Sequence, residues 1–256
     1  MTSEVITSRD NPLVKKLRAL SQEALAYRKH GQVWLEGDHL CRAMLTRGRL
    51  PSLVVMAASG AVDVSQWGVP ASVKVVRVAD AIMAQLSSLE SPAAVAFVLD
   101  LSSAANIRLE APTVVLDRLQ DPGNVGSILR SAAAFGFEQV LALKGTAGLW
   151  APKVVRAGMG AHFGLHLVEG LDVAAVQALQ LPLLGTSSHQ GSYLHQTRLP
   201  WPCTWLMGHE GQGVSQDLFA LSEQVVRIAQ PGGEESLNVA AAAAICLHAS
   251  AAARVL

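Results

Sequence analysis

Apolar residues recur at three- and four-residue steps near the start of the chain, at Leu13, Leu17, Leu20, Ala24 and Tyr27. This spacing places the five side chains on one face of a helix, so it predicts an amphipathic helix over residues 11–28. Further on, short aliphatic runs alternate with helical patterns. The runs predict strands at residues 33–37, 53–56, 73–78 and 95–99, and the patterns between them predict helices at 39–47 and 79–86. Such alternation favours a small α/β or α+β domain.

Small polar residues without periodicity indicate a linker at 102–106, after which the alternation begins again. The expected strands are residues 113–116, 139–143, 183–186, 204–207 and 224–228, and the expected helices are 128–135, 153–157, 173–179, 216–221 and a last helix through Ala252. Strands with so few polar residues are typical of a mostly parallel sheet covered on both faces. We therefore expect an N-terminal domain at 1–103, a linker at 104–111 and an α/β domain at 112–256.

Composition narrows the class of protein. Half of the 256 residues are apolar and 16% are charged, which argues for a folded globular chain. The first residues lack the basic-then-apolar layout of a secretory signal, and the alanine-rich stretch 239–256 contains His248 and Arg254, so a packed helix is expected there rather than a membrane span. Cys41, Cys203 and Cys246 lie far apart, which predicts buried reduced thiols in a cytoplasmic protein and neither a metal site nor a disulfide framework.

Charge is unevenly distributed although the net charge is zero. Residues 1–50 hold nine Lys or Arg against five Asp or Glu. A local basic face can bind phosphates in a neutral protein. A solvated helix surface explains the same charges, and charge alone favours that explanation.

Three polar, glycine-containing segments interrupt the apolar second half, at residues 121–130, 208–213 and 231–238. Each follows or enters an aliphatic run, so each is expected to be a loop at the end of a strand. Ligands bind open α/β sheets where such loops gather, and glycine lets a ligand approach the backbone. The three segments therefore indicate an enzyme site.

Several familiar chemistries do not fit these segments. Gly208, Gly211 and Gly213 reverse the spacing of the dinucleotide-binding G-x-G-x-x-G motif, and the chain contains neither a P-loop nor a G-x-S-x-G elbow. His209 has no partner at metal-ligand spacing and is interpreted as a loop residue.

The remaining polar side chains are Asn124, Arg130, Glu210, Ser236 and Asn238. They include no strong nucleophile and no carboxylate pair, so they suit orientation and charge stabilisation around a reactive cofactor. Helix capping by the asparagines and the serine, and a turn role for the glutamate, are the alternative interpretations. The arginine has apolar neighbours and is expected to need an anionic or polar partner.

At these residues the sequence resembles the SpoU (TrmH-like) branch of the SPOUT RNA methyltransferases. The family's N-x-G-x-x-x-R, G-x-E-x-x-G and I-P-x-x-G-x-x-x-S-L-N-V motifs match, in the same order, at Asn124, Gly126 and Arg130, at Gly208, Glu210 and Gly213, and at Ile228, Gly232, Ser236, Leu237, Asn238 and Val239. Ala229 and Gln230 depart from the family's Pro and Met, which is expected to reshape the cofactor loop. Residues 6–12 and 35–37 bear a weaker likeness to the family's substrate-binding module.

The resemblance implies a C-terminal SPOUT domain with a deep trefoil knot, S-adenosyl-L-methionine as cofactor, and a homodimer. Within the family pattern, Gly208, Ile228 and Leu237 contact the cofactor, and Thr186 lies at the edge of the same pocket. The N-terminal domain would be a ribosomal-protein-like RNA-binding module, for which the candidate contacts are Arg9, Lys15, Lys16 and Arg18.

The implied reaction is 2′-O-methylation of a ribose, in ribosomal RNA rather than transfer RNA because an additional domain is present. The family assigns hydroxyl activation to Arg130, but a guanidinium keeps its proton, so we expect it to grip a phosphate and stabilise the developing alkoxide. Asn124 would orient Arg130 or the ribose, Glu210 would pair with Arg130 or receive the proton, and Ser236 and Asn238 would hold the sugar and the loop. Transfer-RNA methylation, base methylation and a non-catalytic RNA-binding protein remain the alternatives.

Overall fold

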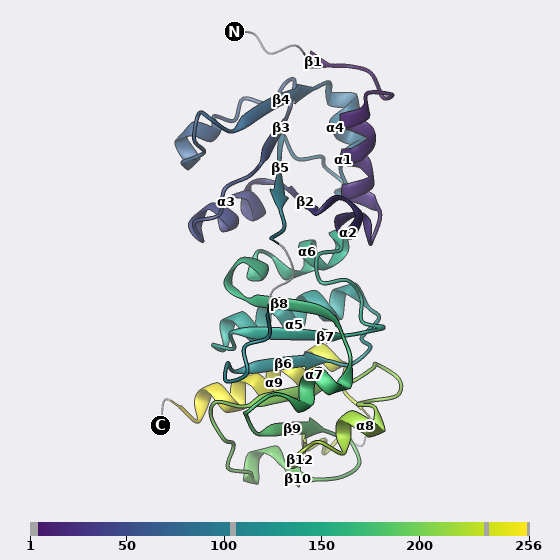
Figure 1. Ribbon diagram of the computed structural model, residues 1–256, viewed down its shortest axis with the longest axis vertical. Helices are drawn as coiled ribbons and strands as arrows, with labels where there is room; N and C mark the ends of the chain where they lie inside the picture. Colours follow the sequence, from purple (N-terminus) through teal and green to yellow (C-terminus); the bar gives the residue numbers. More distant parts are fainter. Residues whose placement is uncertain (1–4, 103–105, 233–235, 255–256) are drawn as a thin grey trace. The chain divides into compact units, whose positions relative to one another are not determined.

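The computed structural model describes residues 5–102, 106–232 and 236–254, which form two compact units (Figure 1). The first unit contains the described residues up to 102 together with the segment Trp150–Phe163. The second contains the described residues of 106–149 and 164–254. Residues 103–105, which include the first two residues of the linker expected at 104–111, lie outside the described residues.

The first unit is built on a five-stranded mixed sheet in the order β1-β4-β3-β5-β2. Strand β1 pairs parallel with β4, and β4 parallel with β3, whereas β5 is antiparallel to both β3 and β2. Its elements are β1 Val5–Ile6, α1 Pro12–Gln22, α2 Ala26–His30, β2 Gln32–Glu36, α3 Asp38–Thr46, β3 Leu53–Ala57, the 3-10 turn η1 Val64–Trp67, β4 Lys74–Val78, α4 Asp80–Leu86, β5 Val95–Asp100 and α6 Pro152–Gly158.

The single helix expected over residues 11–28 is in fact two helices, α1 and α2. Of the five apolar positions expected on one face, Leu17, Leu20 and Tyr27 are buried. Leu13 is half-buried and Ala24 is exposed, whereas Val14, which was not expected on this face, is buried. Near its end, the Ser21 hydroxyl donates to the carbonyl of Arg18 at 3.0 Å, and Glu23 adopts extended backbone. Such back-bonding competes with helix continuation, so the chain breaks before α2 despite continued apolar spacing.

The second unit contains a seven-stranded sheet in the order β10-β12-β9-β11-β6-β7-β8, in which every described pairing is parallel. Its elements are β6 Thr113–Leu116, α5 Pro122–Ala134, β7 Gln139–Leu143, β8 His166–Leu171, α7 Val173–Gln177, β9 Leu183–Thr186, β10 Ser192–Tyr193, η3 Leu194–Gln196, β11 Thr204–Met207, α8 Gln216–Phe219, β12 Gln224–Arg227 and α9 Val239–Ala252. The 3-10 turn η2, Ala161–Gly164, belongs to the first unit except for its last residue.

Helices cover both faces of this sheet, because successive side chains of each strand point to opposite faces. Val115, Leu141 and Leu206 share a core with residues of α7 and α8. On the other side, Trp205 donates from Nε1 to the Ser250 hydroxyl of α9 at 2.9 Å, and α5 packs on α9. This two-sided burial explains the continuous apolar runs in the sequence and confirms the α/β class of the second domain.

The helix expected at 128–135 begins six residues earlier, at Pro122. Asp121 caps it by accepting from the backbone N–H of Asn124 at 2.8 Å, and Pro122 occupies the first helical position. The expectation of a loop for residues 121–127 was wrong because two glycines obscured these start signals. At the other end, Phe135 is the C-cap and Gly136 follows with φ +79°.

The last helix is capped as the sequence predicts. The Asn238 side-chain oxygen accepts from the backbone N–H groups of Ala240 and Ala241 at 2.9 and 3.3 Å. Strands β1, β8 and β10 were not expected: β1 and β10 have two residues each, and β8 is an edge strand without buried positions. Among the described residues, no helix combines the length and hydropathy that a membrane span requires.

A buried glutamine links the segment that leads into β6 to the sheet of the second unit. Gln139, at the start of β7, has no exposed surface. Its amide accepts from the Arg108 N–H at 2.8 Å and donates to the Arg108 carbonyl at 3.0 Å and the Thr113 hydroxyl at 2.9 Å. Because Arg108 precedes β6 and Thr113 begins it, this one side chain fixes the segment that leads into β6 against β7.

We expect Gln139→Leu to lower the free energy of unfolding by about 2–3 kcal/mol, since it leaves buried partners of the amide without hydrogen bonds. Chemical denaturation measures the change. Gln177→Leu, at an exposed position of α7, is the matched control and should change stability by less than about 0.5 kcal/mol. Equal stabilities of the two variants would show that the Gln139 hydrogen bonds contribute nothing net.

Candidate active site at the carboxyl ends of the strands

A large cavity lies where β12, β9, β11 and β6 end, and we call it the carboxyl-end cavity. These four strands are neighbours in the sheet, so the loops that follow them converge. The cavity has a volume of about 850 Å³, within the usual range for small-molecule sites. Its lining includes Thr186, Gly208, Glu210, Ile228, Ser236 and Leu237. All four residues expected to contact a cofactor therefore line one cavity.

Gly208 permits the close turn at the end of β11. A Cβ atom at this position would lie 2.0 Å from the backbone nitrogen of Val214 and 2.1 Å from the carbonyl carbon of Gly213. The backbones of His209 and Gly213 exchange hydrogen bonds of 3.0 and 2.8 Å, which close the loop back on itself. Only glycine fits here, and the absent side chain gives the cavity a wall of backbone.

The three polar segments meet through one amide side chain. Asn124 donates from Nδ2 to Glu210 Oε1 at 3.2 Å, and its Oδ1 accepts from Asn238 Nδ2 at 2.9 Å. We call Glu210, Asn124 and Asn238 the amide bridge. It brings together residues 86 and 114 positions apart in the chain. Asn238 also caps α9, and Asn124 lies in the first turn of α5, where Asp121 is the cap.

Glu210 is held as a carboxylate at the start of α5. Its oxygens also accept from the backbone N–H groups of Asp121 at 3.0 Å and Gln120 at 3.2 Å. Partial burial opposes the charged form, but these backbone donors and the Asn124 amide outweigh it, so the pKa of Glu210 lies below its usual value. The positive end of α5 favours the same charge.

The other two expected catalytic residues lie apart from the amide bridge. Arg130 is exposed on α5 and makes no hydrogen bond or ion pair with any described residue. The expected contact of Glu210 is thus made with Asn124 rather than with Arg130. Ser236 is exposed and lines the carboxyl-end cavity, but it does not cap α9. The segment between it and Gly232, residues 233–235, lies outside the described residues.

The four basic residues expected to contact RNA lie at the start of the first unit. Arg9 and Lys15 are exposed, and Lys16 is half-buried. Lys15 pairs with Asp10 at 2.9 Å, and Arg18 donates to the Gln85 side chain at 3.1 Å. Two of the four charges are thus already engaged by other side chains.

Sequence reasoning missed a polar pair directly after β6. The Asp117 carboxylate is buried and accepts from the Ser215 N–H at 2.6 Å and from Arg118 Nε at 3.0 Å. Arg118 lines the carboxyl-end cavity and donates from Nη1 to Gln212 Oε1 at 3.0 Å. The sequence signal that could have revealed this pair is the occurrence of two adjacent charged residues directly after an apolar strand.

Other expectations concern residues around the site. His209 is a loop residue, as predicted, because its Nδ1 accepts from the N–H groups of Gly211 and Gln212. Gln230 lines the cavity, and its Oε1 is buried with no hydrogen-bond partner in the described part of the chain.

The three cysteines, Cys41, Cys203 and Cys246, are buried free thiols. Burial raises the pKa of Cys203 to about 11 and that of Cys246 to about 12.

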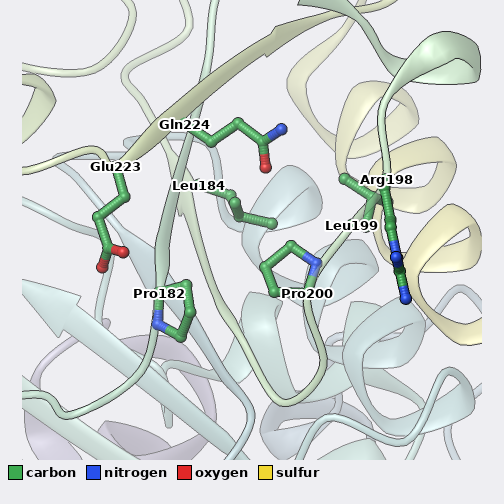
Figure 2. Close-up of a pocket in the computed structure, with 7 residues that line it drawn as sticks. All are labelled: Pro182, Leu184, Arg198, Leu199, Pro200, Glu223 and Gln224. Carbon is green, nitrogen blue, oxygen red and sulfur yellow. The ribbon is translucent and has the colours of Figure 1, made fainter.

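A second, smaller pocket lies at the opposite edge of the sheet, where β9 and β12 begin, and we call it the amino-end pocket. It has a volume of about 480 Å³ and is lined by Pro182, Leu184, Arg198, Leu199, Pro200, Glu223 and Gln224 (Figure 2). Figure 2 shows Arg198 and Glu223 on opposite sides of this pocket, with their charged groups far from each other in the view. No set of polar groups converges there, so the carboxyl-end cavity is the better candidate site.

Comparison with known families finds two matches that cover different parts of the chain. The model of the SpoU rRNA Methylase family matches residues 111–248, more than half of the chain. The model of the MRM3-like substrate binding domain matches residues 11–96.

Individual relatives extend the similarity over the whole chain. An uncharacterised tRNA/rRNA methyltransferase of Synechocystis sp. is 33% identical over 264 residues, which cover 97% of this chain and 94% of the relative. A 23S rRNA (guanosine-2′-O-)-methyltransferase of Bordetella pertussis is 32% identical over 148 residues, or 56% of this chain and 60% of the relative. The solved structure of an AdoMet-bound rRNA methyltransferase from Sinorhizobium meliloti matches with a TM-score of 0.85 and 25% identity over 99% of each chain.

Gly208→Ala should destabilise the second unit by about 1–3 kcal/mol or more, because the added Cβ overlaps the backbone of the Gly213–Val214 peptide. Thermal and chemical unfolding measure the loss. Gly211→Ala is the matched control from the same loop, since a Cβ there meets no atom closer than 3.9 Å. A Gly208 variant as stable as the Gly211 variant would disprove the close approach.

Stability that depends on Glu210 should decrease in acid. Because the folded-state pKa is below the ordinary value of 4.5, the carboxylate stabilises the fold fully above that value and loses its effect as the pH falls through the folded pKa. The difference in unfolding free energy between wild type and Glu210→Ala should therefore shrink between pH 6 and pH 3. A difference that is constant over this range would contradict the carboxylate's role.

Proposed function

Because the chain belongs to the SpoU rRNA methylase family, we propose that it transfers a methyl group from S-adenosyl-L-methionine to a ribose 2′-hydroxyl of ribosomal RNA. The observation that carries the proposal is the amide bridge, which joins all three family motifs beside the carboxyl-end cavity. Orientation and electrostatics are what such a transfer requires of a protein.

The carboxyl-end cavity fits the cofactor in size and in the nature of its walls. Gly208 gives one wall of backbone, and the loops that follow β9, β11 and β12 supply the others. Gly208, Ile228 and Leu237 would hold the nucleoside part, with Thr186 at the edge. When bound, S-adenosyl-L-methionine supplies a methyl group made electrophilic by the sulfonium.

In this proposal Arg130 holds the RNA rather than the cofactor. Its exposed guanidinium has no partner among the described residues, and apolar side chains of α5 flank it. A guanidinium does not give up its proton near neutral pH, but it binds phosphate through two parallel N–H donors. Arg130 thus grips the phosphate next to the reacting ribose and stabilises the oxygen as negative charge develops on it.

Glu210 acts as a positioning residue. Its lowered pKa makes it a weak proton acceptor at neutral pH, and its oxygens are already occupied by three donors. It fixes the Asn124 amide, whose orientation is fixed from the other side by Asn238. Ser236, on the segment that leads into Asn238, holds the ribose. The hydroxyl proton then passes to water.

The first unit binds the RNA substrate in this proposal. Residues 11–96 match a substrate-binding family, and Arg9 and Lys16 add positive charge beside the paired Lys15 and Arg18. The functional division runs from an RNA-binding domain at 1–103, through a linker at 104–111, to a methyltransferase domain at 112–256. This additional domain favours ribosomal over transfer RNA as substrate.

A deep trefoil knot in the second unit, a homodimer and a cytoplasmic location complete the proposal. The family motifs support the knot and the dimer. The exposed side of α9 is largely alanine and includes Ile245, which is 41% exposed, so it suits contact with a second copy. Three free buried thiols suit a reducing compartment.

Two measurements test the function together. Isothermal calorimetry with S-adenosyl-L-methionine determines whether the purified chain binds the methyl donor. Nuclease digestion and mass spectrometry of ribosomal and transfer RNA from a deletion strain identify the missing modification. A missing 2′-O-methyl group in ribosomal RNA is the expected result, whereas a lost base methylation or an unchanged RNA would overturn the proposal.

Arg130→Ala should lower the methylation rate by a factor of about 10² or more, because it removes the charge that stabilises the reacting oxygen. Cofactor affinity should stay within about twofold of wild type, since Arg130 does not line the carboxyl-end cavity. Incorporation of a radioactive methyl group into RNA gives the rate. Arg198→Ala, in the amino-end pocket, controls for the loss of one positive charge, and unchanged turnover of Arg130→Ala would refute the assignment.

A further inference from the structure

Arg118 is the one Lys or Arg among the described residues that line the carboxyl-end cavity. Its ion-pair partner is more deeply buried than the guanidinium itself. Asp117, its ion-pair partner, has a side chain only 2% exposed, whereas that of Arg118 is 35% exposed. The guanidinium therefore offers positive charge and unused N–H donors to whatever occupies the cavity.

The direction of this side chain is fixed from two sides. Nε donates to the buried carboxylate of Asp117 at 3.0 Å, and Nη1 donates to the side-chain oxygen of Gln212 at 3.0 Å. Asp117 is itself held by the Ser215 N–H at 2.6 Å. The other nitrogen of the guanidinium, Nη2, makes no hydrogen bond to a described residue. A surface arginine without a role would not need this support.

The backbone of Arg118 is strained as well. Its φ of +59° lies in the left-handed region, which disfavours a long side chain. Gly145, at φ +91°, leaves room for it, because a Cβ there would lie 3.2 Å from Arg118 Cγ. Strained backbone next to a cavity is a mark of functional positions, where the rest of the fold holds an unfavourable conformation in place.

We propose that Arg118 is an anchor for an oxyanion of the bound ligands, oriented by Asp117 and Gln212. The inference rests on the proposed function and adds to it a binding residue outside the three family motifs. Two oxyanions reach such a site in that reaction, namely the carboxylate of the methyl donor and a phosphate of the RNA. Both are bound by the same fork of N–H donors.

Arg118→Gly is the most informative substitution, because glycine adopts φ +59° without strain and the fold should be retained. S-adenosyl-L-homocysteine carries the carboxylate, and 5′-methylthioadenosine is the corresponding nucleoside thioether without it. Calorimetry with both compounds gives the effect on small-ligand binding. Methylation of unmodified ribosomal RNA transcribed in vitro, at several salt concentrations, gives KM and its salt dependence.

If the anchor holds the carboxylate, Arg118→Gly should weaken S-adenosyl-L-homocysteine binding about tenfold or more and leave 5′-methylthioadenosine binding unchanged. If it holds a phosphate, both affinities should stay unchanged, while KM for RNA rises and depends less steeply on salt. Arg118→Lys keeps the charge without the fork and should fall between wild type and Arg118→Gly. Arg198→Gly, in the amino-end pocket, should behave as wild type.

The failures of the two proposals can be distinguished. A wild-type protein that neither binds S-adenosyl-L-homocysteine nor methylates RNA would overturn the proposed function and the anchor with it. An active wild type beside an Arg118→Gly variant with unchanged affinities, KM and salt dependence would overturn the anchor alone. Thermal unfolding of each variant shows whether a loss of binding reflects a loss of fold.

Discussion

The hydrogen bonds of the Asn124 amide are the constraint on which the site depends. An amide has one acceptor and one donor group, and here the carboxylate of Glu210 takes the donor while Asn238 supplies a donor to the acceptor. The side chain therefore cannot flip without breaking both contacts. Its partners belong to the loop after β11 and to the cap of α9. Asn238 thus caps α9 with its side-chain oxygen and joins the site with its side-chain nitrogen.

The sheet makes this assembly possible by bringing distant segments to one edge. In an all-parallel arrangement, every strand delivers its following loop to the same side, and the order β12-β9-β11-β6 places four such loops next to one another. At the opposite edge lies the smaller amino-end pocket, where no polar groups converge among its lining residues. Polar side chains gather at one edge of the sheet because all described strands run in the same direction. The buried core beneath these loops holds them in fixed positions.

Much of this could be predicted from the sequence because burial and motif order are local signals. The aliphatic runs gave β6, β7, β9 and β11 within a residue, and the three motifs identified the family. The beginning of α5 was missed because its cap and proline compete with two glycines, and β8 was missed because an edge strand has no buried face. Contacts such as Glu210 with Asn124, or Arg118 with Asp117, depend on which loops meet in space. No spacing along the chain encodes that.

The segment Trp150–Phe163 belongs to the first unit, although the residues on both sides of it belong to the second. Its helix α6 packs on α1 and β2. The chain therefore passes between the units more than once, and no single cut separates them into two complete folds. In evolutionary terms, exchange of the first domain alone would leave α6 behind without the surface that it covers. The substrate-binding family match ends at residue 96, so residues 150–163 lie outside it although they belong to the same compact unit.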